Sequence, residues 1–293
     1  LAFSMLVLSR LYGISRSSLL PVAIDEPTAL VSANARLARI GIIAGAVVLP
    51  AGFLAVQIGP AVALLVAVAF FLLSGFLSLG LPDPGSAKPH PASASPSQPG
   101  ALHPYAPVDR RSVRISRLAT AGVRLINGFL ILLLAFAFQE AGQGALDFGA
   151  LVAAGGAGFG IASYLAPWLE KRLREEPMVV AALALEAGAA FLASQGVSLA
   201  AAAAVAGAAG VAWGMAKFGF DGLLQRSVPP GERGQAFTRA ETLFQLAWVV
   251  GAIIPVVISI DAELGMSVAG IAALTAQTVF VAGLLVESGR VAP

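Results

Sequence analysis

The sequence predicts an all-α polytopic membrane protein, and three observations support this fold class. Of the 293 residues, 58% are hydrophobic and 12% are charged, whereas soluble domains carry roughly 25% charged residues. The mean hydropathy is +0.85. Apolar runs of about 20 residues, the length that crosses the hydrocarbon core of a bilayer, recur along most of the chain.

Nine apolar runs are long enough to span a membrane. They cover residues 1–20, 38–58, 61–81, 119–139, 145–169, 177–195, 197–218, 236–260 and 264–286. We therefore predict about nine transmembrane helices.

A polar stretch divides these spans into three and six. Residues 82–109 contain eight of the 18 prolines and both histidines, and they show almost no apolar periodicity. Such a segment cannot bury enough side chain to fold. We expect a partial N-terminal transmembrane bundle over 1–81, a Pro- and Ser-rich linker over 82–112, and a six-helix C-terminal bundle over 113–293.

Positive charge predicts the orientation, because Lys and Arg accumulate in cytoplasmic loops. All 18 Lys and Arg residues lie on alternate connections or on the helix ends facing them. The intervening connections, which contain none, follow Ile58, Gln139, Gln195 and Ile260. We expect the linker and the C-terminus to be cytoplasmic. Most of these cations then contact anionic lipid, including the run RRSVRISR at Arg110, predicted to lie on the inner leaflet before the fourth helix.

The chemistry available to an enzyme is sparse. The chain has no cysteine, and His90 and His103 both lie in the linker. No apolar segment pairs a nucleophile with a base. We therefore predict no enzymatic activity, no cofactor, no metal site and no nucleic-acid partner.

Glycines are expected to serve helix packing. The run GGAGFG at Gly155 lies within a helix and follows no strand, so it does not fit a dinucleotide site. Gly207, Gly210 and Gly214 lie in an alanine-rich span, where small residues allow close approach of two backbones.

An internal repeat relates two parts of the chain. Residues 10–50 and 217–255 each contain a helix end, a proline-bearing turn, a polar helix start and a small-residue helix leading to a proline. Pro50 and Pro255 share an offset of 205 residues with the pair Ala35 and Ala240. This pattern indicates a parallel repeat about an axis along the membrane normal.

The repeated blocks resemble the major facilitator superfamily. The resemblance rests on LSRLYGISRSSLLP, LVSANARLARIG, RGQAFTRAETLFQLAWVVGAIIP and GIASYLAPWLEKRLREE. In the last block, Gly160 keeps the glycine of the family's loop motif, and Lys171 with Arg172 keeps its positive charge. In detail, these blocks most resemble the sequences of efflux branches of the family from GC-rich bacteria.

The resemblance implies two six-helix halves joined by a long cytoplasmic loop. The first helix present would be the family's fourth, so we expect an N-terminally truncated chain with three further helices upstream. It also implies a monomeric secondary transporter in the bacterial cytoplasmic membrane, exporting a small amphipathic solute by alternating access with protons as coupling ion, among lipids. The alternatives are a transport-inactive receptor or assembly protein of the same fold, and a lipid flippase.

Glu186 lies at the middle of its span, where a charge costs about 2.5 to 3.5 kcal/mol on insertion scales. It is either a proton-binding carboxylate or a neutral acid that bonds a neighbouring helix. We favour the second interpretation, because the resemblance makes this helix peripheral.

Three residues at four-residue spacing share one face of the span 197–218 and its continuation. Lys217 and Asp221 are predicted to form an intrahelical pair. Trp213 lies deeper, and it either stacks on a flat or cationic solute or fills the core.

The next span carries a polar stripe with Thr238, Glu241, Thr242, Gln245 and Trp248. Polar stripes in spanning helices face a bundle interior or an aqueous path. Gln245 and Trp248 are therefore candidates for a cavity wall, and Glu241 for a cytoplasmic gate.

Further candidates lie on two other helices. Arg124 is near enough to the cytoplasm to extend to the membrane surface, which we favour over a cavity position. Asn127 lies deeper on the same face. Arg10 resembles the arginine of the family's fourth helix, which is linked to proton coupling, and Tyr12 could line the path with Arg16.

Overall fold

The computed structural model describes residues 2–22, 30–80, 110–172, 175–196 and 198–288. Every regular element within these ranges is a helix. The helices are α1 (Ala2–Leu19), a 3-10 turn (Leu20–Val22), α2 (Leu30–Ile58), α3 (Pro60–Ser78), α4 (Arg110–Glu140), α5 (Ala145–Glu170), α6 (Glu175–Ala193), α7 (Leu199–Ser227), α8 (Pro230–Val257) and α9 (Ala262–Ser288). The all-α prediction is confirmed.

The helices have the length and composition of membrane spans. Seven in the described ranges are long and apolar enough to cross a bilayer, namely α2, α3, α4, α5, α7, α8 and α9, while α6 contains a shorter apolar helix over Pro177–Ala193. On α3, Leu72 is 70% exposed and Phe76 is 73% exposed. Apolar side chains at this exposure fit contact with lipid, so the chain is an integral membrane protein.

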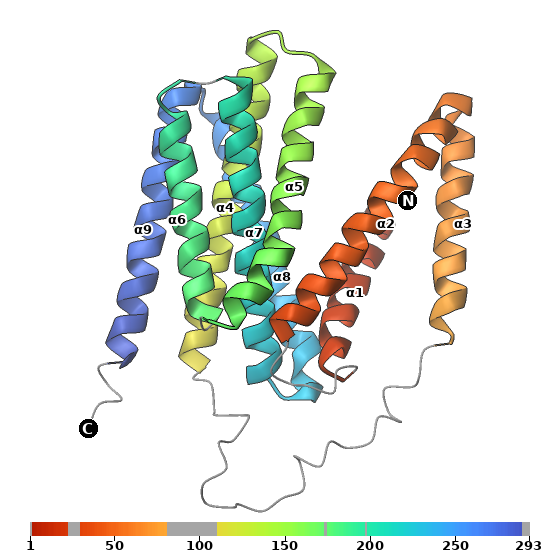
Figure 1. The fold of residues 1–293 in the computed structure, drawn as a ribbon, viewed down its shortest axis with the longest axis horizontal. Coiled ribbons are helices and arrows are strands. Elements are labelled where there is room, and N and C mark those ends of the chain that lie inside the picture. The colour runs from red at the N-terminus through yellow and green to blue at the C-terminus, as the bar shows by residue number, and fades with distance from the viewer. Residues whose placement is uncertain (1, 23–29, 81–109, 173–174, 197, 289–293) are drawn as a thin grey trace, which may run out of the picture.

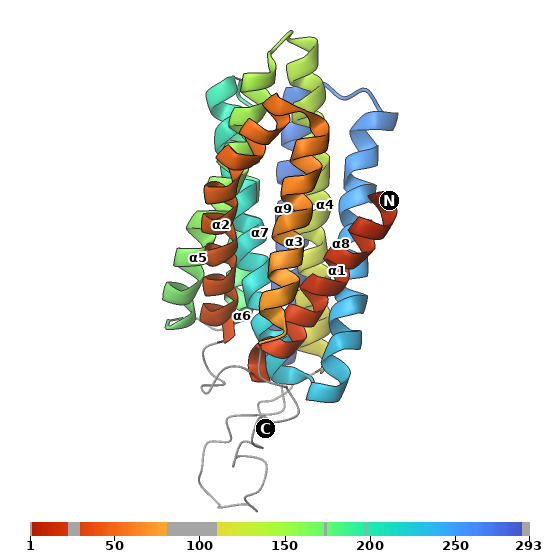
Figure 2. The same cartoon turned by 90° about the vertical axis from the view of Figure 1, so that its right-hand side faces the viewer.

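The helices form two groups. Helices α4–α9 lie side by side in one bundle, and α1–α3 stand beside it (Figure 1). α1 packs against α8, α2 packs against α5 and α7, and α3 packs on α2 (Figure 2). We call the end where α3 finishes and α4 begins the linker end, and the opposite end the far end.

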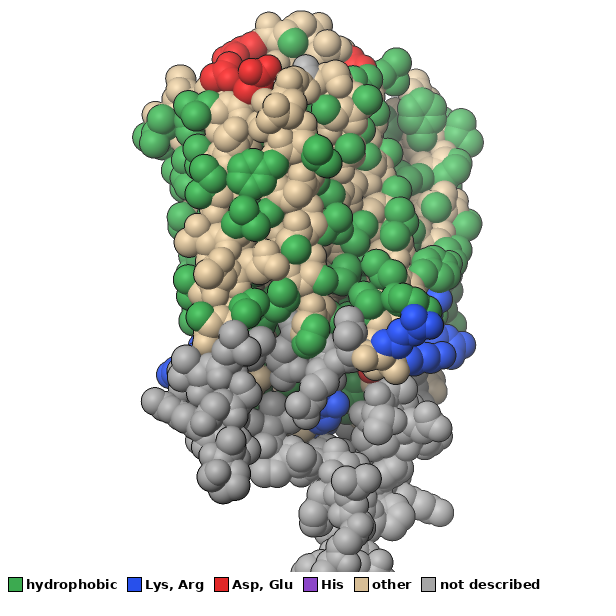
Figure 3. Space-filling model, turned by 60° about the vertical axis from the view of Figure 1, so that its left-hand side comes forward, with side chains coloured by type: hydrophobic (Ala, Val, Ile, Leu, Met, Phe, Trp, Pro, Cys, Tyr) green, Lys and Arg blue, Asp and Glu red, His purple; other side chains and the backbone are tan. Residues whose placement is uncertain are grey.

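Charge separates between the two ends. Acidic side chains gather at the far end, and basic side chains lie at the linker end (Figure 3). Four acidic residues lie in the far-end connections or in the helix turns next to them, namely Glu140, Asp147, Asp261 and Glu263. This is the distribution that the alternating charge pattern predicts.

Glycines set the closest helix contacts in the bundle. A Cβ on Gly128 would overlap the carbonyl oxygen of Trp248, and a Cβ on Gly251 would overlap that of Leu125, so α4 and α8 touch through their backbones. A Cβ on Gly158 would overlap the carbonyl oxygen of Gly207, and one on Gly210 that of Gly155. The predicted close approach of α7 is thereby confirmed, with α5 as the partner.

Helix α4 differs from the prediction at its start. The expected span begins at residue 119, whereas α4 begins at Arg110, so RRSVRISR forms its first turns instead of preceding the helix. Charged side chains can extend a helix beyond the bilayer, because the backbone hydrogen bonds are made within the helix itself. The last three residues of the predicted linker, 110–112, thus belong to α4. Residues 81–109, with both histidines, lie outside the described residues.

Candidate functional site

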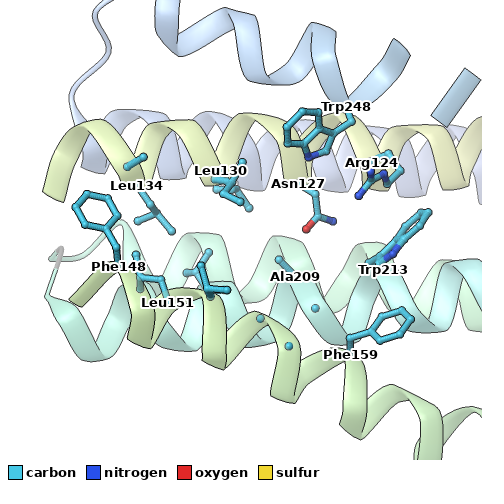
Figure 4. Close-up of a pocket in the computed structure, with 18 residues that line it drawn as sticks. Arg124, Asn127, Leu130, Leu134, Phe148, Leu151, Phe159, Ala209, Trp213 and Trp248 are labelled. Carbon is cyan, nitrogen blue, oxygen red and sulfur yellow. The ribbon is translucent and has the colours of Figure 1, made fainter. Parts of the chain in front are cut away.

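Two cavities lie next to each other among the helices. The bundle cavity has a volume of about 480 Å³ and lies between α4, α5, α7 and α8 (Figure 4). It is lined by Arg124, Asn127, Leu130, Ile131, Leu134, Ala135, Phe148, Leu151, Val152, Gly155, Gly156, Phe159, Val205, Ala206, Ala209, Gly210, Trp213 and Trp248.

The interface cavity lies where α1 and α2 meet the C-terminal helices. Its volume is about 490 Å³, and its polar lining comprises Ser9, Arg16, Ser17, Asn34, Arg124, Trp213, Lys217, Asp221, Glu241 and Gln245. Arg124, Phe159 and Trp213 line both cavities. These three side chains therefore form the boundary between a largely apolar cavity and a charged one.

Arg124 lies over aromatic rings inside the bundle. Its Cζ lies 4.4 Å from the ring centroid of Trp213 and 5.9 Å from that of Trp248. Trp213 is held in turn by an edge contact with Phe244, at 6.2 Å between centroids. The expectation that Arg124 extends to the membrane surface is wrong, because its side chain lines both cavities and an aromatic face attracts its cation.

Lys217 joins two carboxylates. Its Nζ lies 2.6 Å from Oδ1 of Asp221, as the four-residue spacing predicts, and 2.7 Å from Oε1 of Glu241. The first pair lies within α7, whereas the second links α7 to α8. All three side chains line the interface cavity and are mostly buried.

Asn127 connects the bundle cavity to a buried acid. Its Nδ2 donates to the carbonyl oxygen of Val123 and to Oε1 of Glu186, both at 3.0 Å. Glu186 on α6 is 1% exposed, and its Oε2 has no hydrogen-bond partner among the described residues. The bond between helices is the structural arrangement that we favoured for Glu186, which does not line either cavity described above.

The two helix groups are joined by hydrogen bonds near the linker end. Glu170 at the end of α5 accepts from the backbone N–H of Val31 and Ser32 at 3.2 and 3.0 Å, and from Oγ of Ser32 at 2.6 Å. A carboxylate at the first turn of α2 is favoured by the helix dipole. Gln225 on α7 accepts from Asn34 and donates to the carbonyl oxygen of Ser17, both at 2.7 Å.

Sequence reasoning missed Glu170 and Gln225. Both lie in the last turns of helices, α5 and α7, whereas the charge pattern assigns these segments to basic connections. The available clue for Glu170 is that it is an acid at the edge of the basic turn LEKRLREE. Gln225 offers no comparable clue, because its partners are distant in the sequence.

A comparison with protein-family models shows which family this chain belongs to. The family model of the Major Facilitator Superfamily matches residues 3–252. The chain belongs to the Major Facilitator Superfamily. The resemblance stated from the sequence is confirmed.

A solved structure shares the major facilitator fold. It is described as the crystal structure of a bacterial homologue of the iron transporter ferroportin in the outward-facing state. The TM-score is 0.63 at 20% sequence identity, over 94% of this chain and 69% of the other. A search of curated proteins found no match. Membership of this family supports a membrane transporter for a small-molecule solute.

The remaining candidates take different positions in this major facilitator chain. Gln245 and Glu241 line the interface cavity, and Trp248 lines the bundle cavity. Tyr12 is 66% exposed and lines neither of these cavities. Arg10 lies in α1, but its side chain is outside the described part of the structure.

The residues of the polar stripe on α8 differ in exposure. Thr238 and Thr242 are exposed and donate to carbonyl oxygens of their own helix, so they contribute little to the cavities.

Proposed function

We propose that this chain is a secondary active transporter that exports a small amphipathic solute by alternating access, with protons as the coupling ion. It acts as a monomer in the bacterial cytoplasmic membrane, with the linker and C-terminus in the cytoplasm. The observation that carries the proposal is the position of Lys217, Asp221 and Glu241. This cluster borders the cavity between two helix groups, next to a cavity that is large enough for a small molecule.

The arrangement of the two groups supports alternating access. Hydrogen bonds join α2 to α5 and α7 near the linker end, while α2 leans away from α5 toward the far end (Figure 1). With basic residues on the cytoplasmic side, this is a conformation closed to the cytoplasm. Movement of one group against the other would open the linker end and expose the interface cavity.

The character of the bundle cavity supports an amphipathic solute over a metal ion. The structural neighbour is named for an iron transporter. Here the cavity lining combines Arg124 and Asn127 with apolar and aromatic side chains. A fixed guanidinium repels a metal cation, whereas the apolar walls favour an organic body.

Glu241 is the proposed coupling carboxylate. It shares Lys217 with Asp221, so a proton on Glu241 would release its link to α7 and favour a different packing of α8. A ligand shifts a conformational equilibrium only by its difference in affinity for the two states, and this link supplies such a difference for a proton.

The test uses purified protein in proteoliposomes with an imposed pH gradient and an internal pH-sensitive dye. Adding an amphipathic solute should dissipate the gradient in the wild type, and Glu241→Gln should abolish the response. Thr242→Val is the matched control, because Thr242 is the exposed neighbour of Glu241, and it should respond like the wild type. The test uses a panel of anionic, neutral and cationic amphipaths. If none of them is transported and none dissipates the pH gradient, the receptor or assembly function replaces transport.

A further inference from the structure

We propose that the bundle cavity selects an amphipathic organic anion, with its acid group at Arg124 and its apolar body toward Phe148. The inference rests on the proposed transport function and names the solute class for that site. It follows from the distribution of charge along the cavity.

The bundle cavity is polar at one end and apolar at the other. Arg124, Asn127 and the two tryptophans lie at one end, whereas Phe148, Leu134 and Leu151 lie at the other (Figure 4). Among the described residues that line this cavity, Arg124 is the ionisable one. A solute that fills the cavity therefore meets a single positive charge at one end and hydrocarbon along the rest.

The geometry of Arg124 suits an acid group. Its Cζ lies over the ring of Trp213, 4.4 Å from the ring centroid, which holds the guanidinium at the polar end of the cavity. Arginine can bind a carboxylate or sulfonate through two parallel N–H···O bonds. The Asn127 amide donates to Val123 and Glu186, so among the described residues that line this end Arg124 supplies the positive charge that an acid group would meet.

The same geometry disfavours a cationic solute. An aromatic ring attracts a cation to its face, but Arg124 already lies over one face of the Trp213 ring. A second cation there would also meet the guanidinium charge. The stacking of a cationic solute on Trp213, which the sequence left open, is therefore the less favourable arrangement.

Charge along the adjoining cavity points the same way. Among the described residues, the ionisable side chains that line the two cavities are three cations, Arg16, Arg124 and Lys217, and two carboxylates, Asp221 and Glu241. Both carboxylates are bound by Lys217. When ionised, these described side chains carry three positive and two negative charges, a net charge of +1. A monoanionic solute would balance this net charge, whereas a cation would increase it.

The test measures binding in nanodiscs of zwitterionic phosphatidylcholine. The chain has three tryptophans, and Trp168 is on α5 against Arg172, outside both cavities. In a Trp168→Phe variant, the tryptophan fluorescence therefore comes from Trp213 and Trp248. The probes are octanoate, its neutral analogue octanamide, and octyltrimethylammonium, which share one chain length.

We expect octanoate to change the tryptophan emission saturably and to bind at least tenfold tighter than octanamide. Arg124→Gln should remove this preference, and Arg124→Lys should keep part of it, because the charge remains without the planar fork. The three probes are also compared on the Trp168→Phe protein with Arg124 intact, so this part of the test does not depend on the folding of an Arg124 variant. Equal or tighter binding of octyltrimethylammonium, no saturable binding of octanoate, or unchanged octanoate binding by folded Arg124→Gln would each overturn the assignment.

The proteoliposome assay separates this inference from transport. If cationic amphipaths dissipate the pH gradient through the wild type while octanoate does not bind, the anion assignment fails and transport stands. If octanoate binds with the expected Arg124 dependence but no solute is moved, the anion site stands and the transport proposal fails.

Discussion

Asn34 on α2 donates its side-chain amide to Oε1 of Gln225 on α7, with 2.7 Å between the two atoms. The two residues are 191 positions apart, and their side chains are 7% and 0% exposed. Gln225 also donates to the carbonyl oxygen of Ser17. One amide therefore ties both α1 and α2 to the C-terminal bundle near the linker end.

Replacing Gln225 with Leu should weaken this end of the interface. The variant keeps similar volume but loses both hydrogen bonds and leaves the Ser17 carbonyl unpaired, which costs about 1–3 kcal/mol for a buried group. Because the chain has no cysteine, a single Leu37→Cys substitution in the interface cavity reports on access. We expect severalfold faster labelling by a membrane-impermeant thiol reagent added at the linker side. Gln195→Leu, at an exposed far-end position, is the control, and equal rates in both variants would contradict the role of Gln225.

Lys217→Met should destabilise the protein, on the order of 3 kcal/mol, because it leaves two largely buried carboxylates without their cation. The measurement is denaturant unfolding in detergent. The triple variant Lys217→Met, Asp221→Asn, Glu241→Gln should recover much of the loss, since it removes all three charges together. Lys171→Met, at an exposed position, should have little effect. A triple variant no more stable than the single one would show that the ion pairs do not account for the loss.

Gly251→Ala should cost about 1–3 kcal/mol, the usual range for overpacking. The added methyl group would overlap the carbonyl oxygen of Leu125, and a backbone atom cannot turn aside as a side chain can. Gly45→Ala on α2 is the matched control, because a Cβ there meets no atom within 4 Å. Thermal unfolding should separate the two variants by several degrees, and similar melting temperatures would count against backbone contact between α4 and α8.

Asn127→Leu should be more destabilising than Glu186→Gln. The first removes the donor to Oε1 of Glu186 and leaves a buried acid uncompensated, at a cost of about 1–3 kcal/mol. The second keeps the shape and the acceptor oxygen, so stability should change little. In a double-mutant cycle, Asn127→Leu with Glu186→Leu should cost less than the sum of the single changes. Additive effects would show that the two residues act independently.

The candidate residues show where sequence reasoning succeeds. The Lys217–Asp221 pair and the close approach at Gly210 follow from helical spacing and residue size, which are local properties. The link from Lys217 to Glu241 depends on how α7 packs against α8, and spacing within one helix does not contain it. Arg124 illustrates the same limit, since its distance from the helix end suggested the surface, whereas Trp213 and Trp248 hold it inside.

The sequence by itself determined the fold class, the helices and the family. The lengths of the apolar runs, the positions of the charged residues and the repeated blocks can all be identified in the sequence without knowing how the helices pack. It also named several residues that line the two cavities, among them Arg124, Trp213 and Gln245. Only the tertiary structure decided which faces meet. The bonds from Glu170 to Ser32 and from Gln225 to Asn34 join residues 138 and 191 positions apart. The physical reason is that helical spacing determines which side chains share one face of a helix. A cavity or an interface instead forms where the faces of separate helices pack together.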